Sequence, residues 1–328
     1  MIAAPSAPNI AHAASLLAAG GLVGMPTETV YGLAANASSQ AAVAGIYAAK
    51  GRPADHPVIV HLAPAADVAF WVKDLPEYAI KLMQAAWPGP LTLVCPRTGN
   101  APDWVTGGQD TVGIRCPSHP VAQALLTAAL GLGVQGIAAP SANRFGRVSP
   151  TTAAHVEGEF DAPPYTLDGG ACEVGIESTI VDCTQAAPRI LRFGAISLHD
   201  VARITGLSVV DGVYHVKPSQ THAQDSTPRV SGGLAAHYAP NTRLYYAEAD
   251  QAQHIQADAV YLGWQRPSHL SCAFQAMPQD AALYARQLYA TLRQLDTMGY
   301  GAIAVQPVPT DEAWLGVADR LNRAAASF

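Results

Sequence analysis

The sequence predicts an α/β protein with two domains. Hydrophobic residues make up 49% of the chain and charged residues 13%, a balance typical of compact globular proteins rather than disordered or fibrous ones. Short apolar runs typical of buried strands alternate with longer stretches of helical periodicity. The length of 328 residues exceeds what one hydrophobic core usually supports, so we expect a division into two domains.

The order of these patterns gives the domain boundaries. Helices are predicted at residues 10–19, 40–50, 76–87 and 119–130, and strands at 22–25, 57–62, 90–95, 111–115, 136–139 and 178–183. A second α/β unit is predicted from strand-like runs at 243–246, 259–263 and 302–308 and an amphipathic stretch at 281–298. Between them, His, Pro, Ser, Gln and Gly predominate as in a linker. We place the domains at 1–206 and 242–328, joined by a linker at 207–241.

Composition argues against several classes of function. The formal net charge of −6 gives no global basic surface for nucleic acid. The five cysteines include no CxxC pair and the eleven histidines no HExxH, so we expect neither a disulfide framework nor a metal held by protein side chains. The N-terminal residues lack the pattern of a signal peptide, and no apolar run approaches a membrane span. We therefore expect a cytoplasmic protein without membrane contact.

The common catalytic and nucleotide-binding motifs are either missing from the sequence or stand in the wrong order of predicted elements. Residues 131–136 match GxGxxG, but they follow a predicted helix and lead into a strand, the reverse of the dinucleotide-binding order. The sequence contains no GxxxxGK[ST] segment, so nucleotide phosphates would need another arrangement. It contains no GxSxG elbow either, and covalent catalysis is not expected.

Polar residues follow two of the predicted elements. The segment PTETVYGL, from Pro26 to Leu33, breaks a buried strand and presents two threonines, a carboxylate and a phenol; either a site or a turn with capping threonines fits it. Lys50 and Arg52 stand two apart on a loop constrained by Gly and Pro, which suits phosphate oxygens, although a solvated helix C-terminus is the alternative. The next strand delivers His61.

A hydroxyl and a guanidinium share one face of the strand at 111–115, because Thr111 and Arg115 are four residues apart. An arginine in an apolar strand must be paired or meet an anionic ligand, and a ligand carboxylate is one candidate.

Further hydroxyl, amide and cationic groups come from later loops. Residues 140–151 carry Ser141, Asn143 and Ser149, which can cradle phosphate or base edges. The segments GIESTI and LRFG add another hydroxyl turn with Ser178 and an arginine, Arg192, before glycine.

These segments together resemble a known family. The motifs PTETVYGL, KGRP with PVIVH, WPGPLT, TVGIR, APSAN with SP, GIESTIVD and LRFG occur in this order from Pro26 to Gly194, and in this combination the sequence resembles the YrdC family. SGGLAAHYAP at 231–240 is similar to the linker of the two-domain members, the L-threonylcarbamoyladenylate synthases. The resemblance therefore covers nearly the whole chain.

The resemblance implies a fold and an activity. The fold would be a catalytic domain with a twisted mixed α/β sheet, followed by a smaller Rossmann-like domain. The activity would be a nucleotidyltransferase that makes L-threonylcarbamoyladenylate and pyrophosphate from ATP, L-threonine and bicarbonate, with Mg²⁺ accompanying ATP. Separate transferase machinery would use the product to modify N6 of adenosine 37 in ANN-decoding tRNAs; direct tRNA contact by this chain is left open.

The resemblance also assigns roles to individual positions. The threonine-binding positions are Thr27, His61, Arg115 and Ser178. The ATP-side positions are Lys50, Arg52, Thr111, Ser141, Asn143, Ser149 and Arg192. Of these, Lys50 and Arg52 would absorb charge as pyrophosphate leaves. Tyr238 and its neighbours would form a lid that excludes water.

The sequence departs from the family pattern in the linker, where Ser231 and Gly233 replace a frequent Pro and Met, and around Pro57, where His56 and Val58 replace a frequent Asn or Lys and Leu. Two other functions are alternatives. Hydrogenase-maturation carbamoyltransferases carry a YrdC-like domain, but also zinc-finger modules that a chain without CxxC lacks. A double-stranded RNA or tRNA-binding module without turnover would use Lys and Arg contacts to phosphates, which the acidic net charge disfavours.

Overall fold

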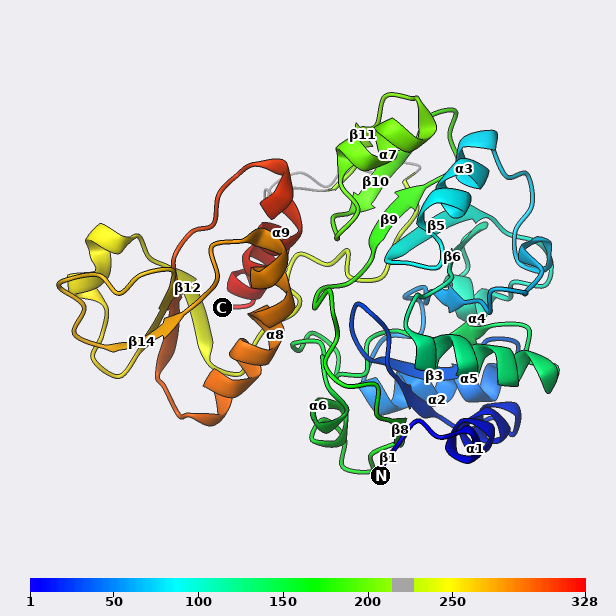
Figure 1. Cartoon of the computed structure of the whole chain (residues 1–328), viewed down its shortest axis with the longest axis horizontal. Coiled ribbons are helices and arrows are strands. Elements are labelled where there is room, and N and C mark those ends of the chain that lie inside the picture. The colour runs from blue at the N-terminus through cyan, green and yellow to red at the C-terminus, as the bar shows by residue number, and fades with distance from the viewer. Residues whose placement is uncertain (214–226) are drawn as a thin grey trace.

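The computed structural model describes residues 1–213 and 227–328, and these ranges form two α/β domains (Figure 1). The larger, N-terminal domain is built on an 11-stranded mixed sheet, and the smaller one on a 4-stranded parallel sheet. Residues 214–226, which belong to the predicted linker, lie outside the described residues. The predicted fold class, a mixed-sheet domain followed by a smaller α/β domain, is confirmed.

The large sheet joins segments that are distant in the sequence. Its strand order is β1-β8-β2-β3-β7-β4-β6-β5-β9-β10-β11. The bounds are β1 (Ile2–Ala3), β2 (Val23–Met25), β3 (Gly32–Asn36), β4 (Val60–His61), β5 (Leu91–Pro96), β6 (Thr111–Arg115), β7 (Ile137–Ala138), β8 (Tyr165–Leu167), β9 (Thr179–Asp182), β10 (Arg189–Arg192) and β11 (Val210–Asp211). In the middle, β4 pairs with β7 on one side and with β6 on the other, and His61 at the end of β4 lies in register with Arg115 at the end of β6.

Helices cover both faces of this sheet. They are α1 (Ala7–Ala18), α2 (Gln40–Lys50), α3 (Glu77–Ala86), α4 (Asp103–Thr106), α5 (Pro120–Gly131), α6 (Ala153–Glu157) and α7 (Leu198–Thr205), with a 3-10 turn, η1 (Val68–Phe70). Successive side chains of a strand point to opposite faces. Accordingly, Ala34 of β3 shares a core with α1 and α5, whereas Leu33 and Ala35 share a core with α2 and α3.

The smaller domain has strand order β12-β15-β13-β14, and all neighbouring strands are parallel. Its elements are β12 (Arg243–Tyr246), η2 (Ala249–His254), β13 (Val260–Gly263), β14 (Ala273–Ala276), α8 (Ala281–Thr297), β15 (Ala302–Val305), η3 (Glu312–Trp314) and α9 (Leu315–Ala325). Helices α8 and α9 lie between this sheet and the larger domain (Figure 1). They therefore form the side of the smaller domain that meets the rest of the chain.

The two domains pack closely through α8 and α9. Apolar residues of both helices share one core with Val30, Val148 and Ile176 of the larger domain. Gly175 has a φ of +81°, and a Cβ built on it would lie 2.4 Å from the Cα of Arg286 in α8. Only a residue without a side chain permits this approach of two backbones.

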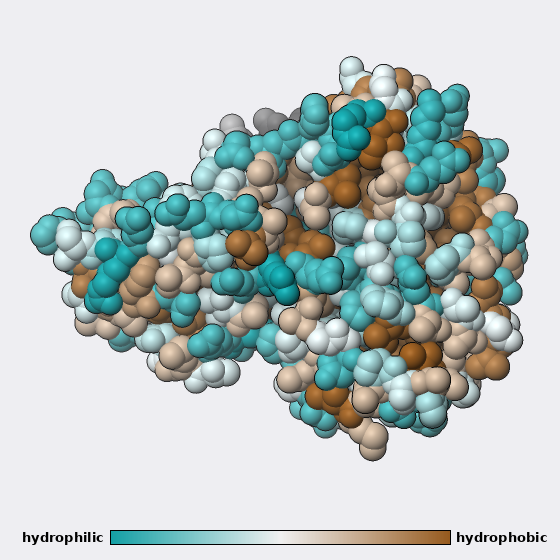
Figure 2. Space-filling view, in the orientation of Figure 1, coloured by the Kyte–Doolittle hydropathy of each residue, from teal (hydrophilic) through white to brown (hydrophobic). Residues whose placement is uncertain are grey.

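The predicted elements are present but differ in length, and several observed elements were not predicted. The run at 57–62 forms a strand only at Val60–His61, and β11 lies inside the range predicted to be linker. Strands β1, β3, β8, β10, β11 and β14 and helices α4, α6, α7 and α9 were not predicted. No helix in the described ranges is long and apolar enough to cross a membrane. On the face in Figure 2, hydrophobic residues lie in separate small groups rather than in one patch.

The close approach of Gly175 to the backbone of α8 predicts that a side chain at this position destabilises the protein. A side chain there must displace the backbone of α8, so we expect Gly175→Ala to lower the free energy of unfolding by more than about 2 kcal/mol. Gly146→Ala is the matched control, because Gly146 has the same φ of +81° but nothing within 4 Å of its Cβ position. Urea unfolding of both variants measures the difference; equal losses would contradict a steric origin.

Candidate active site

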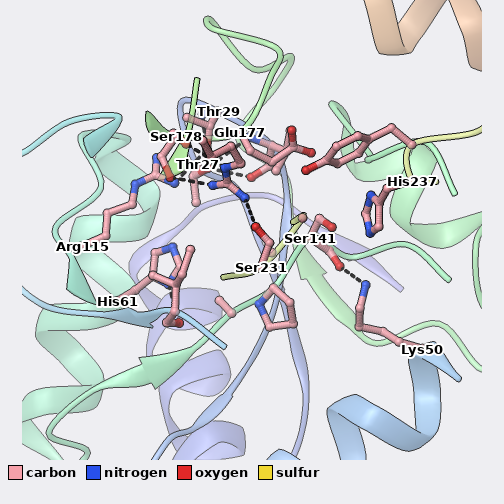
Figure 3. A pocket seen from close by; sticks show the side chains of 18 of the residues that line it. Thr27, Thr29, Lys50, His61, Arg115, Ser141, Glu177, Ser178, Ser231 and His237 are labelled. Atoms are coloured by element: carbon pink, nitrogen blue, oxygen red, sulfur yellow. Dashed lines mark hydrogen bonds between the residues drawn. The ribbon is translucent and has the colours of Figure 1, made fainter. Parts of the chain in front are cut away.

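A cavity in the larger domain collects most of the predicted site residues (Figure 3). Those that line it are Thr27, Lys50, Arg52, His61, Arg115, Ser141, Ser178, Arg192 and Tyr238. In the view of Figure 3, Arg115 and His61 lie on one side of the cavity, and Lys50 and His237 lie on the other. The cavity thus has two ends with different side chains.

The end of α2 presents Lys50 and Arg52. Ser39 caps the N-terminus of this helix by accepting a hydrogen bond from the amide of Ala42, and Gly51 ends it in a left-handed conformation with φ 62°. The turn directs both cations into the protein. The ammonium of Lys50 donates to the carbonyl oxygens of Ser141 and Asn143, and Arg52 Nη2 donates to the carbonyl of Pro57 at 2.8 Å.

Three cations around the cavity are buried without a counter-charge. The exposed fractions of Lys50, Arg52 and Arg192 are 4%, 8% and 4%. In residues 1–213 and 227–328, no carboxylate forms an ion pair with any of them, and their hydrogen bonds go mainly to carbonyl oxygens. Burial, together with the neighbouring Arg52, lowers the pKa of Lys50 well below its ordinary value. Buried cations in this state favour an anionic ligand.

Arg115, which lies in an apolar strand, is already paired with a carboxylate of the protein. Its Nη2 donates to Glu28 Oε1 at 2.6 Å, its Nη1 to the hydroxyl of Thr29 at 2.9 Å, and its Nε to the carbonyl of Gly89 at 3.3 Å. Both members of the ion pair are buried. Glu28 and Thr29 lie in the predicted PTETVYGL segment but were not assigned a role, because the sequence does not reveal their contact with β6.

The β2–β3 hairpin and β4 complete this end of the cavity. The hydroxyl of Thr27 donates to the carbonyl of Val30 at 2.6 Å and accepts from the amide of Thr29 at 3.2 Å, so it organises the turn. His61, the last residue of β4, is buried. Burial and the adjacent Arg115 lower the pKa of His61 to about 3, so its imidazole is neutral at neutral pH.

Ser178 and Arg192 are joined by hydrogen bonds. Arg192 Nη2 donates to Ser178 Oγ and its Nε to the Ser178 carbonyl, each at 3.0 Å, while its Nη1 reaches the carbonyl of Ser231 at 2.9 Å. Ser178 Oγ is also 2.8 Å from the hydroxyl of Thr92. The preceding residue, Glu177, lines the cavity as well and was not predicted.

Three predicted ATP-side residues do not line this cavity. Thr111 borders a neighbouring pocket that the linker residues Val230 and Ser231 also line. The amide of Asn143 donates to the carbonyls of its own loop, and its Oδ1 has no partner among the described residues. Ser149 is buried and donates to Glu177 Oε1 at 2.5 Å, so it supports the cavity wall from behind.

The linker closes one side of the cavity. Ser231, Gly232, His237 and Tyr238 all line it. A Cβ on Gly232 would lie 2.1 Å from the hydroxyl of Tyr238, so the two parts of the linker are in direct contact. Burial lowers the pKa of His237 to about 3 despite the nearby Glu177, and burial raises the pKa of Tyr238.

Comparisons with known proteins identify the family of this chain. The Sua5/YciO/YrdC model, described as telomere recombination, matches residues 15–194, and the model of the threonylcarbamoyl-AMP synthase C-terminal domain matches residues 196–326. A threonylcarbamoyl-AMP synthase of Pyrococcus abyssi is 34% identical over 97% of this chain and 94% of its own length, and one of Bacillus subtilis is 36% identical over 97% and 93%. This chain belongs to the threonylcarbamoyl-AMP synthase family.

Solved structures agree with this membership in the synthase family. P. abyssi Sua5 complexed with L-threonine matches with a TM-score of 0.88 and 33% identity, covering 100% of this chain and 98% of that one. Full-length HypF matches at a TM-score of 0.50 and 20% identity, with coverage of 58% of this chain and 30% of its own, which shows a shared fold alone. The predicted resemblance is confirmed, and an enzyme is favoured over an RNA-binding module.

The low pKa of His61 predicts how the stability of the protein changes with pH. The folded chain keeps His61 neutral down to about pH 3, whereas an unfolded histidine takes up a proton below about pH 6.5. The contribution of His61 to the free energy of unfolding is therefore fully present above pH 6.5. It is lost as the pH falls towards 3, at about 1 kcal/mol per pH unit. His61→Gln should remove that part of the slope in urea unfolding between pH 7 and 4. An identical slope in both proteins would contradict the buried, neutral imidazole.

Proposed function

We propose that this chain is an L-threonylcarbamoyladenylate synthase, which converts ATP, L-threonine and bicarbonate into threonylcarbamoyl-AMP, pyrophosphate and water. The observation that carries the proposal is the set of three buried cations without carboxylate partners, which face the same cavity as Arg115 and several hydroxyls. The names of the full-length relatives and the L-threonine complex of P. abyssi Sua5 support it.

L-Threonine would bind at the end of the cavity where Arg115 and His61 lie. The guanidinium of Arg115 would meet the substrate carboxylate, while Glu28 and Thr29 hold it in place from the other side. Thr27 and Ser178 would offer hydroxyls to the substrate's polar groups. Because His61 is neutral, it can donate or accept a hydrogen bond without adding a third charge to the Arg115–Glu28 pair.

ATP would bind towards Lys50, Arg52 and Arg192, with Ser141 beside them. The amine of L-threonine would form an N–C bond with bicarbonate, with loss of water, to give the threonine carbamate. An oxygen of this carbamate would then form a bond to the α-phosphorus as the bond to the pyrophosphate oxygen breaks. The three cations would stabilise the negative charge that develops on the leaving pyrophosphate, and the cavity would hold the reactants in line. In this arrangement no side chain of the protein has to act as a nucleophile.

Mg²⁺ would enter with ATP rather than on a site of the protein. In the described ranges there is no group of three His, Cys, Asp or Glu side chains that could hold a metal ion. Glu177, a carboxylate at the cavity, already accepts hydrogen bonds from Ser149, Tyr289 and Arg320. The ion would thus be bound by the phosphates, where it neutralises charge.

The linker would act as a lid over the bound reactants. Tyr238 and His237 lie against the cavity, and Ser231 accepts a hydrogen bond from Arg192, one of the proposed ATP-side cations. A closed linker would exclude water from the mixed anhydride, which is prone to hydrolysis. In the cytoplasm, the product would pass to transferase machinery that modifies N6 of adenosine 37 in ANN-decoding tRNAs. The proposal does not require the chain to bind tRNA.

Turnover by the synthase should depend on L-threonine and on both cations. With ATP, Mg²⁺ and bicarbonate, we expect pyrophosphate release to depend on L-threonine, and Lys50→Ala with Arg52→Ala to lower kcat/KM by about 100-fold or more, because both cations are lost from the leaving group. Lys81→Ala is the control, since Lys81 is an exposed partner of Glu77. Threonine-independent release, or none from folded protein, would refute the synthase.

Binding of the carboxylate of L-threonine should depend on the guanidinium of Arg115. Arg115→Lys keeps the charge but loses the fork that reaches Glu28, Thr29 and a ligand together. We expect the KM for L-threonine to rise about tenfold or more, with the KM for ATP little changed. Initial rates at varied concentrations of each substrate give both constants. An equal rise in both would place Arg115 outside the threonine subsite.

A further inference from the structure

A buried arginine of the smaller domain reaches the wall of the cavity. Arg320 lies on α9 and is 1% exposed. Its Nε donates to Glu177 Oε2 at 2.8 Å, its Nη2 to the Glu177 carbonyl at 3.3 Å, and its Nη1 to the carbonyl of Phe193 at 2.8 Å. One guanidinium thereby holds two separate segments of the larger domain.

The two segments that Arg320 holds carry proposed ligand residues. Ser178 follows Glu177, and Arg192 precedes Phe193. Ser178 and Arg192 also bind one another through the hydrogen bonds described above, at 3.0 Å each. The spacing and direction of these two side chains therefore depend on backbone positions that α9 fixes.

The carboxylate of Glu177 is fully engaged in the same cluster. Oε1 accepts from Ser149 Oγ at 2.5 Å, and Oε2 accepts from the Tyr289 hydroxyl at 3.0 Å as well as from Arg320. Burial raises the pKa of Glu177, but Arg320 and Arg192 outweigh burial and lower the pKa to about 2. Arg320 also lies over the ring of Tyr238, 5.2 Å from its centroid. The cluster thus joins both domains and the linker.

We propose that Arg320 is a positioning residue of the active site, through which the smaller domain fixes the segments that present Ser178 and Arg192 to the substrates. The identity of these substrates rests on the proposed function, whereas the contacts of Arg320 do not. The smaller domain then completes the site without touching the reactants. A purely structural ion pair is the competing explanation, because breaking a buried pair is destabilising whatever its function.

A pair of variants separates these explanations. Glu177→Gln removes the carboxylate charge but leaves Arg320 with Asp319, whose Oδ2 lies 2.8 Å from its Nη1. Adding Arg320→Met to this variant removes the guanidinium and leaves Asp319 with Arg323, at 2.9 Å. Neither protein leaves Glu177, Arg320 or Asp319 as a buried charge without a partner. The double variant still loses the hydrogen bonds from Arg320 to the carbonyls of Glu177 and Phe193, so we expect a modestly lower unfolding temperature, and both proteins are compared well below it.

The kinetic comparison of these two proteins is the test. We expect kcat/KM to be about tenfold lower or more in Glu177→Gln/Arg320→Met than in Glu177→Gln, mainly through higher KM values for L-threonine and ATP, because displaced ligand residues weaken binding. Equal kcat/KM in the two proteins would overturn the proposal and leave Arg320 a structural residue. Arg320→Met alone leaves the buried carboxylate of Glu177 without its ion-pair partner, so this variant should lose both stability and activity.

Glu312→Ala is the control for a contact between the domains away from the cavity, since Glu312 accepts a hydrogen bond from the amide of His199 at 2.6 Å. We expect its KM values to match those of the unmodified chain. If the unmodified chain shows no threonine-dependent turnover, the proposed function fails, and calorimetry then decides about Arg320. An unchanged Kd for ATP between Glu177→Gln and the double variant would overturn the positioning role, and a rise of about tenfold would support it.

Discussion

The arrangement of the site depends on holding the basic side chains of Lys50, Arg52 and Arg192 buried and free of carboxylate partners. Removing a cation from water is costly, and carbonyl oxygens that are not used in a sheet replace part of the lost hydration. The carbonyls of Ser141 and Asn143 are available because β7 ends before them. Short strands and irregular loops around the cavity are therefore a requirement of its electrostatics.

The carboxylates near the cavity form their ion pairs with other arginines, not with these cations. Glu28 is bound by Arg115, and Glu177 by Arg320, which lies on the smaller domain. Each carboxylate has its own arginine and forms no ion pair with the cations on the proposed ATP side, while the charge of Glu177 still acts on Arg192 at longer range. The linker contributes a carbonyl from Ser231 rather than an acidic side chain. The cavity thus keeps a positive potential that suits a polyphosphate.

The sequence predicted much of the cavity because Lys50, His61 and Arg115 are the last residues of α2, β4 and β6, where polar groups after an apolar run are visible. Pairings such as Glu177 with Arg320, 143 residues apart, leave no periodic signal. Strands of two or three residues such as β1 and β8 are too short to show one. Thr111 shares a face with Arg115, but four residues span about 13 Å of strand, which takes it out of the cavity.

The contact between Gly175 and the backbone of α8 limits how the sequences of the two domains can change during evolution. Three residues after this glycine comes Ser178, and α8 carries Tyr289, which binds Glu177. A hybrid that combined the larger domain of this chain with the smaller domain of a distant relative would have to preserve the path of α8 at Gly175 and the partners of Glu177 at the same time. The two halves of the chain are thus constrained to diverge together, even though each has a sheet of its own.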